Sequence, residues 1–125
     1  MSHPKLVKLP KPEIVEKVWG RELILFNNKE LCGKLLQFNK GAAFSLHCHK
    51  EKYEFFRVNY GKLRVEGVRT EDASRYYFDL GAGDVLEVQR GAFHKLTALE
   101  ESEITEFSTE HQDSDSYRIE PSRNK

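Results

Sequence analysis

The sequence has no excess of charge of either sign, no long hydrophobic run and few cysteines. Lys and Arg together number 20, and Asp and Glu also number 20, which gives a formal net charge of zero. A balanced charge gives no indication of nucleic acid or an anionic membrane surface as a partner. No apolar stretch approaches the roughly 20 residues that span a bilayer, and the amino terminus lacks the apolar core of a secretion signal. We therefore expect a cytoplasmic protein that binds neither nucleic acid nor membrane.

The two cysteines, Cys32 and Cys48, do not have a spacing typical of a zinc site or a redox pair. No segment keeps a helical period of 3.6 residues over three turns. Instead, about ten short apolar runs alternate with turn residues, a pattern typical of an all-β sandwich or barrel. A chain of 125 residues suits a single domain.

Composition divides the chain into three parts. Residues 1–12 contain several lysines and prolines and are predicted to form an extended arm. Residues 13–109 contain the strand-like runs and are predicted to form the barrel. Residues 110–125 form a polar tail, in which residues 116–119 have the pattern of one further short strand.

Two segments carry residues suited to metal chemistry. The first contains His47 and His49 and, five residues later, Glu54. Side chains two apart on a strand point to the same face, so both imidazoles can reach one point, and Glu54 can return from the next strand. Two histidines and a carboxylate with open positions make a facial metal site. The second segment ends in a third histidine, His94.

Together these segments resemble the two motifs of the cupin superfamily. The first motif is G-x5-H-x-H-x4-E-x6-G, and all five of its fixed positions match between Gly41 and Gly61. The second is G-x5-P-x-G-x2-H-x3-N, in which Gln89 and Ala98 replace the proline and the asparagine. The positions of the second motif that match are Gly83, Gly91 and His94.

The cupin resemblance implies a fold, a cofactor and an assembly. The expected fold is an all-β double-stranded β-helix, or jelly-roll barrel, with a metal ion inside its mouth. The implied ion is divalent (Zn, Mn, Fe, Co or Ni), because ligand type alone does not choose among these metals. Cupins commonly pair through edge strands, so a homodimer is expected, with the amino-terminal arm as a candidate for exchange. The implied metal ligands are His47, His49, Glu54 and His94.

The chain is also similar to the cupin part of type II phosphomannose isomerases. Lys52 stands where that family has an arginine, and His47 stands where it commonly has glutamine. The resemblance implies a small carbohydrate substrate and an isomerase or epimerase reaction through a metal-stabilised enediolate. The matching residues are Val15, Lys17, Trp19, Gly20, Lys34, Ser45, Leu46, Glu106 and Thr109.

The same resemblance suggests roles for five residues of the expected cavity. Glu106 is the candidate base that moves a proton between adjacent carbons. Lys52 is the second candidate catalytic residue. Lys34 and Ser45 are candidates for substrate binding, and Arg118 for a phosphate, because its fork of donors suits that group.

Two other functions fit the same metal site. An iron-dependent dioxygenase would need Fe(II) and open positions for oxygen. A non-catalytic cupin would bind a carbohydrate and leave it unchanged. Oxygen consumption would distinguish the first from an isomerase, and sugar binding without turnover would identify the second.

Overall fold

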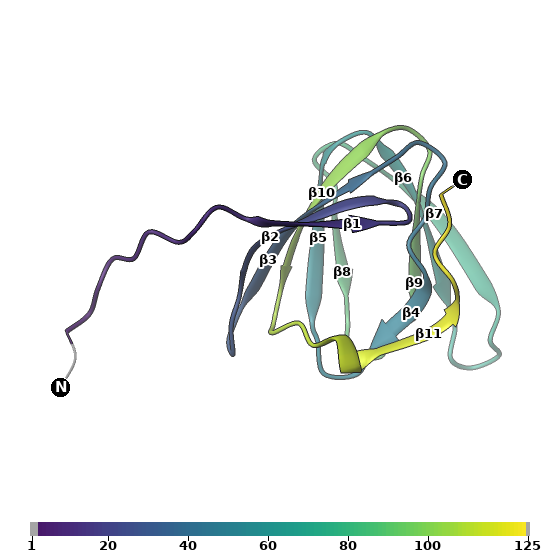
Figure 1. Ribbon diagram of the computed structural model, residues 1–125. Coiled ribbons are helices and arrows are strands. Elements are labelled where there is room, and N and C mark those ends of the chain that lie inside the picture. The colour runs from purple at the N-terminus through teal and green to yellow at the C-terminus, as the bar shows by residue number, and fades with distance from the viewer. Residues whose placement is uncertain (1–2, 125) are drawn as a thin grey trace.

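The computed structural model describes residues 3–124, and almost all of its regular structure is β-strand (Figure 1). No helix in this range is long and apolar enough to cross a membrane. The prediction of an all-β protein is confirmed. The strands are β1 (Glu13–Lys17), β2 (Gly20–Asn27), β3 (Cys32–Phe38), β4 (Leu46–His49), β5 (Glu54–Tyr60), β6 (Lys62–Val68), β7 (Arg75–Gly81), β8 (Val85–Val88), β9 (His94–Ala98), β10 (Ser102–Ser108) and β11 (Ser116–Glu120), with a 3-10 turn η1 (Asp113–Asp115).

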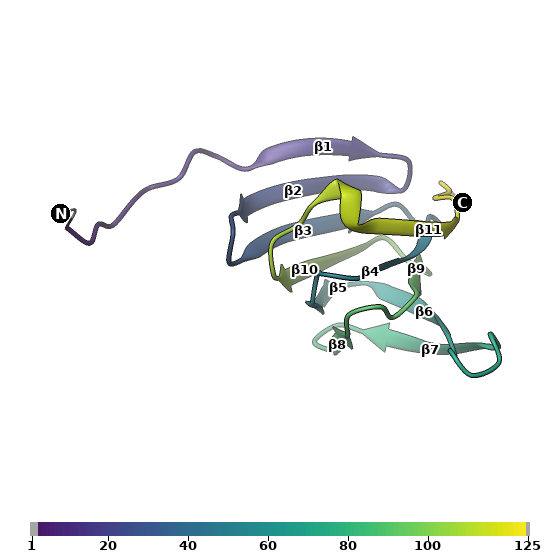
Figure 2. The same ribbon diagram turned by 90° about the horizontal axis from the view of Figure 1, so that it is seen from below.

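The strands form two antiparallel sheets that face each other across the interior. The six-stranded sheet has the order β1-β2-β3-β10-β5-β8, and the five-stranded sheet has the order β11-β4-β9-β6-β7. Figure 1 shows the two sheets as opposite walls of the barrel, and Figure 2 shows the strands of the larger sheet side by side. Non-consecutive neighbours such as β3 and β10 bring segments far apart in sequence onto one wall.

The inner face of the larger sheet changes from apolar to polar along the strands. Ile104 and Leu36 are register partners on β10 and β3, and both are buried in the core. Two positions away from this pair, toward the end of β10 and the start of β3, the register partners are Glu106 and Lys34, which are also buried. Because inward positions recur with a period of two, the same strands supply the core at one end and a charged wall at the other.

Aromatic rings close the barrel on the apolar side of this boundary. Trp19 stacks on Phe38 with ring centroids 4.6 Å apart, and Phe44 packs at an angle to both. Phe44 also contacts the rings of His47 and His94 edge-on. The core therefore supports the histidines directly and limits how far their rings can turn.

The two ends of the chain differ in how they meet the barrel. Residues 3–12 contain no strand and extend away from the barrel (Figure 1), with Leu6 fully exposed. The carboxyl-terminal segment instead adds β11 to β4, with Ser116 opposite His49 and Arg118 opposite His47. Residues 1, 2 and 125 of the expected arm and tail lie outside the described range.

Two motif glycines have the same left-handed backbone but different surroundings. Gly61 joins β5 to β6 with φ of +94°, and a Cβ there would lie 2.1 Å from Ser102 Oγ and 2.5 Å from Glu101 O. Gly83 has φ of +89°, but a Cβ there would meet nothing within 4 Å. The left-handed conformation alone costs an alanine about 1–2 kcal/mol.

This contrast predicts unequal effects of the same substitution. Gly83→Ala is expected to lower the free energy of unfolding by about 1–2 kcal/mol, and Gly61→Ala by about 3 kcal/mol or more because overpacking adds to backbone strain. Urea unfolding of both variants checks the difference. An equal decrease in the free energy of unfolding of the two variants would show that the atoms around Gly61 move aside without destabilising the fold.

Candidate metal centre

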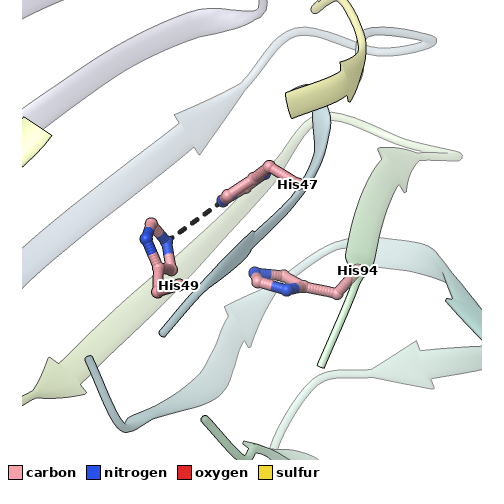
Figure 3. Close-up of side chains that lie close together, drawn as sticks. All are labelled: His47, His49 and His94. Atoms are coloured by element: carbon pink, nitrogen blue, oxygen red, sulfur yellow. Dashed lines mark hydrogen bonds between the residues drawn. The ribbon is translucent and has the colours of Figure 1, made fainter. Parts of the chain in front are cut away.

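Three histidines converge where β4 and β9 pair. His47 and His49 lie on β4, and His94, the first residue of β9, is the register partner of His47. One nitrogen of each ring lies within 4.8 Å of the corresponding nitrogens of the other two. Figure 3 shows the three imidazoles turned toward one another from the two strands.

Each of the three rings makes the same kind of hydrogen bond on its far side. The partner of Nδ1 is a backbone carbonyl oxygen in every case, and a carbonyl can only accept. Nδ1 therefore carries the proton, and Nε2 of a neutral ring presents a lone pair. The pairs are His47 with Ser45 (2.6 Å), His49 with Asp115 (3.1 Å) and His94 with Ala92 (2.9 Å).

Burial keeps two of these rings neutral. Burial, together with the neighbouring His94, lowers the pKa of His47 to about 3. Burial also lowers the pKa of His49, although the charge of Glu54 opposes the shift. The Nε2 atoms of His47 and His49 lie 3.2 Å apart (Figure 3). With both protons on Nδ1, two lone pairs face each other, and a cation between the rings would satisfy both.

Glu54, the first residue of β5, brings a carboxylate to the same point. Its Oε2 lies 3.1 Å from His94 Nε2 and 3.7 Å from His49 Nε2. Glu54 Oε2 and His94 Nε2 are both buried, and neither has a hydrogen-bond partner in the part of the chain that the structure describes. Burial raises the pKa of this carboxyl, but His94, Lys52 and His49 outweigh it and hold the pKa below its ordinary value.

The donor set fits a divalent metal ion. Three imidazole nitrogens and one carboxylate oxygen are the ligands that Zn and the other first-row metals accept. Buried polar atoms are normally hydrogen-bonded, so two orphaned atoms that face each other indicate a missing partner of positive charge. The backbone carbonyls behind the rings supply the outer hydrogen bonds that orient metal-bound histidines.

The cluster opens into a cavity of about 200 Å³ between the two sheets and the carboxyl-terminal segment. Lys52 lies in its wall with 3% of its surface exposed. Its Nζ is 2.5 Å from Glu106 Oε2 and 3.4 Å from Glu54 Oε1. Burial lowers the pKa of Lys52, but the two carboxylates raise it above its ordinary value, so this ammonium stays charged.

A second buried ion pair lies in the same wall. Lys34 Nζ is 2.7 Å from Glu22 Oε1, and both side chains line the cavity. Ser45 is buried, and its Oγ lies 3.3 Å from His47 Nδ1. Arg118, on β11, lines the cavity as well but is exposed. The structure thus brings all nine sequence-predicted site residues to one cavity and the histidine cluster beside it.

Sequence reasoning missed three residues that contact this set. Glu22 pairs with Lys34, and Asp115 accepts from His49 through its carbonyl oxygen. His111 Nδ1 lies 2.9 Å from Lys52 Nζ, and burial lowers the pKa of its ring. Of the three, only Glu22 could have been found from the sequence, because its position in the alternation of its strand predicts an inward side chain. Asp115 and His111 lie in the tail and belong to no motif.

Comparisons with known proteins identify the fold. Neither protein-family models nor curated proteins gave a match. Among solved structures, the oxalate decarboxylase of Lactobacillus farciminis, in a formate complex, is 21% identical with a TM-score of 0.77 over 94% of this chain. The Bacillus subtilis oxalate decarboxylase is 20% identical with a TM-score of 0.76, also over 94%.

These similarities show the fold alone. The chain spans 38% of the length of the Lactobacillus protein and 33% of the Bacillus protein. Both are cupins, so the prediction of a cupin jelly-roll barrel is confirmed. The chain therefore has the cupin fold with a three-histidine cluster suited to metal.

Proposed function

We propose that this protein is a metal-dependent isomerase or epimerase of a small sugar or sugar phosphate. One observation carries the proposal: the buried Lys52–Glu106 pair lies beside the histidine cluster in the same cavity. A charged carboxylate and an ammonium next to a metal site provide the groups that proton transfer between adjacent carbons needs.

Four side chains would hold the metal, which would be Zn, Mn, Fe, Co or Ni. When bound, such an ion supplies Lewis-acid polarisation of a carbonyl and stabilises negative charge on neighbouring oxygens. The backbone bonds to Nδ1 already fix the three rings with Nε2 inward, so little reorganisation is needed on binding. The proposed ligands are His47, His49, Glu54 and His94.

Glu106 is the proposed base. Its Oε2 accepts hydrogen bonds from Lys52 Nζ and, at 3.0 Å, from Ser108 Oγ. These bonds aim the carboxylate and leave its second oxygen to take a proton from the substrate carbon and return it to the neighbouring carbon. Lys52 keeps its own proton between two carboxylates, so it serves to orient Glu106 and to donate to a substrate oxygen.

The remaining polar residues favour a substrate rich in hydroxyl groups. Lys34 and Lys52 are each paired with a glutamate, so neither presents an uncompensated charge to a small dianion. A lysine next to a carboxylate instead offers a donor and an acceptor side by side, which suits a hydroxyl. Ser45 adds a further hydroxyl at the cluster, and Arg118 lies where a phosphate could be held.

Assembly is proposed from the amino-terminal part of the chain. β1 is an edge strand of the larger sheet, and an unpaired edge is a template for another strand. Leu6, Val7 and Leu9 of the arm are exposed. We infer that the protein forms a homodimer in which the arm and β1 contact the second copy.

The experiment is a screen of metal-loaded protein against aldoses, ketoses and their phosphates in deuterated water. Isomerisation is expected to exchange the proton next to the carbonyl, which NMR detects. Glu106→Gln is expected to keep its metal and to lower the rate about 100-fold or more, because a positioned base contributes at least that factor.

Glu103→Gln is the matched control. Glu103 lies on the same strand but bonds to Gln37 and Asn59 instead of lining the cavity, so its rate should equal that of the wild type. Full activity in Glu106→Gln would remove Glu106 from the mechanism. Sugar binding without exchange would leave the carbohydrate-binding alternative, and oxygen uptake by the iron-loaded protein would favour the dioxygenase.

A further inference from the structure

Asp115, in the turn η1, is a buried carboxylate that the proposed reaction does not use. Its side chain enters the loop between β4 and β5 from the carboxyl-terminal segment, and only 6% of the residue is exposed. Three successive backbone N–H groups of that loop donate to it. Lys50 N lies 2.9 Å from Oδ1, Glu51 N lies 3.1 Å from Oδ1 and 3.2 Å from Oδ2, and Lys52 N lies 3.0 Å from Oδ2.

The loop that Asp115 fills connects two proposed metal ligands. His49 ends β4 and Glu54 begins β5, so residues 50–53 are the segment that joins the imidazole to the carboxylate. Successive N–H groups that converge on one anion form a nest, and hydrogen bonds to a charged acceptor are about twice as strong as neutral ones. Asp115 thus holds the loop in one conformation.

The main chain of Asp115 acts on the same centre from a second direction. Its carbonyl oxygen accepts the Nδ1 proton of His49, with the two atoms 3.1 Å apart. The next residue, Ser116, is the register partner of His49 at the start of β11. A single residue of the tail therefore fixes the ring of one ligand and the chain that leads to another.

We propose that Asp115 is a positioning residue of the metal centre, and that the carboxyl-terminal segment 113–120 is consequently part of that centre. The inference rests on the proposed metal site. It implies coupling in both directions, because a segment that strengthens metal binding must itself be held more firmly when metal is bound. Loss of an outer-sphere partner of this kind typically weakens metal affinity 10- to 100-fold.

The test measures Zn(II) affinity of the full chain by competition with a chelator. Asp115→Asn keeps the size of the side chain but replaces one accepting oxygen with an NH2 group that faces a backbone N–H. We expect its Zn(II) affinity to fall about 10- to 100-fold. Asp72→Asn is the control, since Asp72 also accepts a hydrogen bond from a backbone N–H, that of Ser74 at 2.9 Å, but lies in an exposed turn outside the cavity lining. Its affinity should match that of the wild type.

A second measurement needs no variant. Hydrogen exchange of the wild-type protein with and without Zn(II) should show added protection of the amides of residues 113–120 when the metal is bound. Equal Zn(II) affinity in Asp115→Asn and the wild type, or no added protection of the tail, would overturn the proposal. Absence of Zn(II) binding by the wild type would overturn the metal site itself. The two failures are distinguishable, because the first leaves the wild-type protein with a measurable Zn(II) affinity and the second does not.

Discussion

His94→Ala is expected to weaken the binding of a divalent metal by more than about 100-fold. His94 is the only proposed ligand on β9, and within residues 3–124 its Nε2 is one of two buried side-chain nitrogen or oxygen atoms without a hydrogen-bond partner. Removing it leaves the two imidazoles of β4 and the carboxylate of Glu54. Because even outer-sphere changes cost 10- to 100-fold, loss of a ligand should weaken metal affinity by more than about 100-fold. Elemental analysis and Zn(II) titration measure the change.

His3→Ala is the control for this experiment. His3 lies in the exposed arm, remote from the cavity, so its removal should leave one ion per chain. Retention of a full equivalent of metal by His94→Ala would contradict the assignment of β9 to the site. The same titration on His49→Ala and Glu54→Gln would then show which side chains hold the ion.

Lys52→Met is expected to destabilise the metal-free protein by about 3–5 kcal/mol. The lysine is buried between Glu106 and Glu54, and breaking a buried ion pair by removing one partner leaves uncompensated charge at about this cost. Here two carboxylates lose the same cation. The metal-loaded protein should lose less, since the ion would still compensate Glu54. Urea unfolding with and without a chelator measures both values.

Lys40→Met provides the comparison for a lysine outside the cavity. Lys40 is an exposed turn residue, and surface substitutions usually change stability by less than about 0.5 kcal/mol. An equally small change in Lys52→Met would show that Glu54 and Glu106 do not depend on this ammonium. The proposed role of Lys52 in orienting Glu106 would then be wrong as well.

Local pattern was sufficient to predict most of the strands and the convergence of the three histidines. Residues 116–119 were predicted to form one further short strand, and β11 covers Ser116–Glu120. His47 and His49 share a face because strand geometry requires it, and the register of β4 with β9 places His94 opposite His47. These predictions depend on neighbours in sequence, or on a motif that encodes the pairing of two strands.

The contacts behind the ligands depend on pairings that no local pattern contains. Asp115 reaches a loop 63 to 65 residues away in sequence, and His111 reaches Lys52 across 59 residues. Alternation predicts that Glu106 and Lys34 point inward, but their adjacency requires knowing that β10 pairs with β3. The tail was predicted from its composition as a polar segment, which gave no reason to expect a buried carboxylate.

The central claim is that three histidines and one glutamate hold a divalent ion inside a cupin barrel. Elemental analysis of untagged wild-type protein, as purified and after reconstitution with Zn, Mn, Fe, Co or Ni, tests this claim most directly. The account predicts one ion per chain, with at least one of these metals retained after gel filtration. Protein that stays metal-free after reconstitution with every one of them would contradict the account.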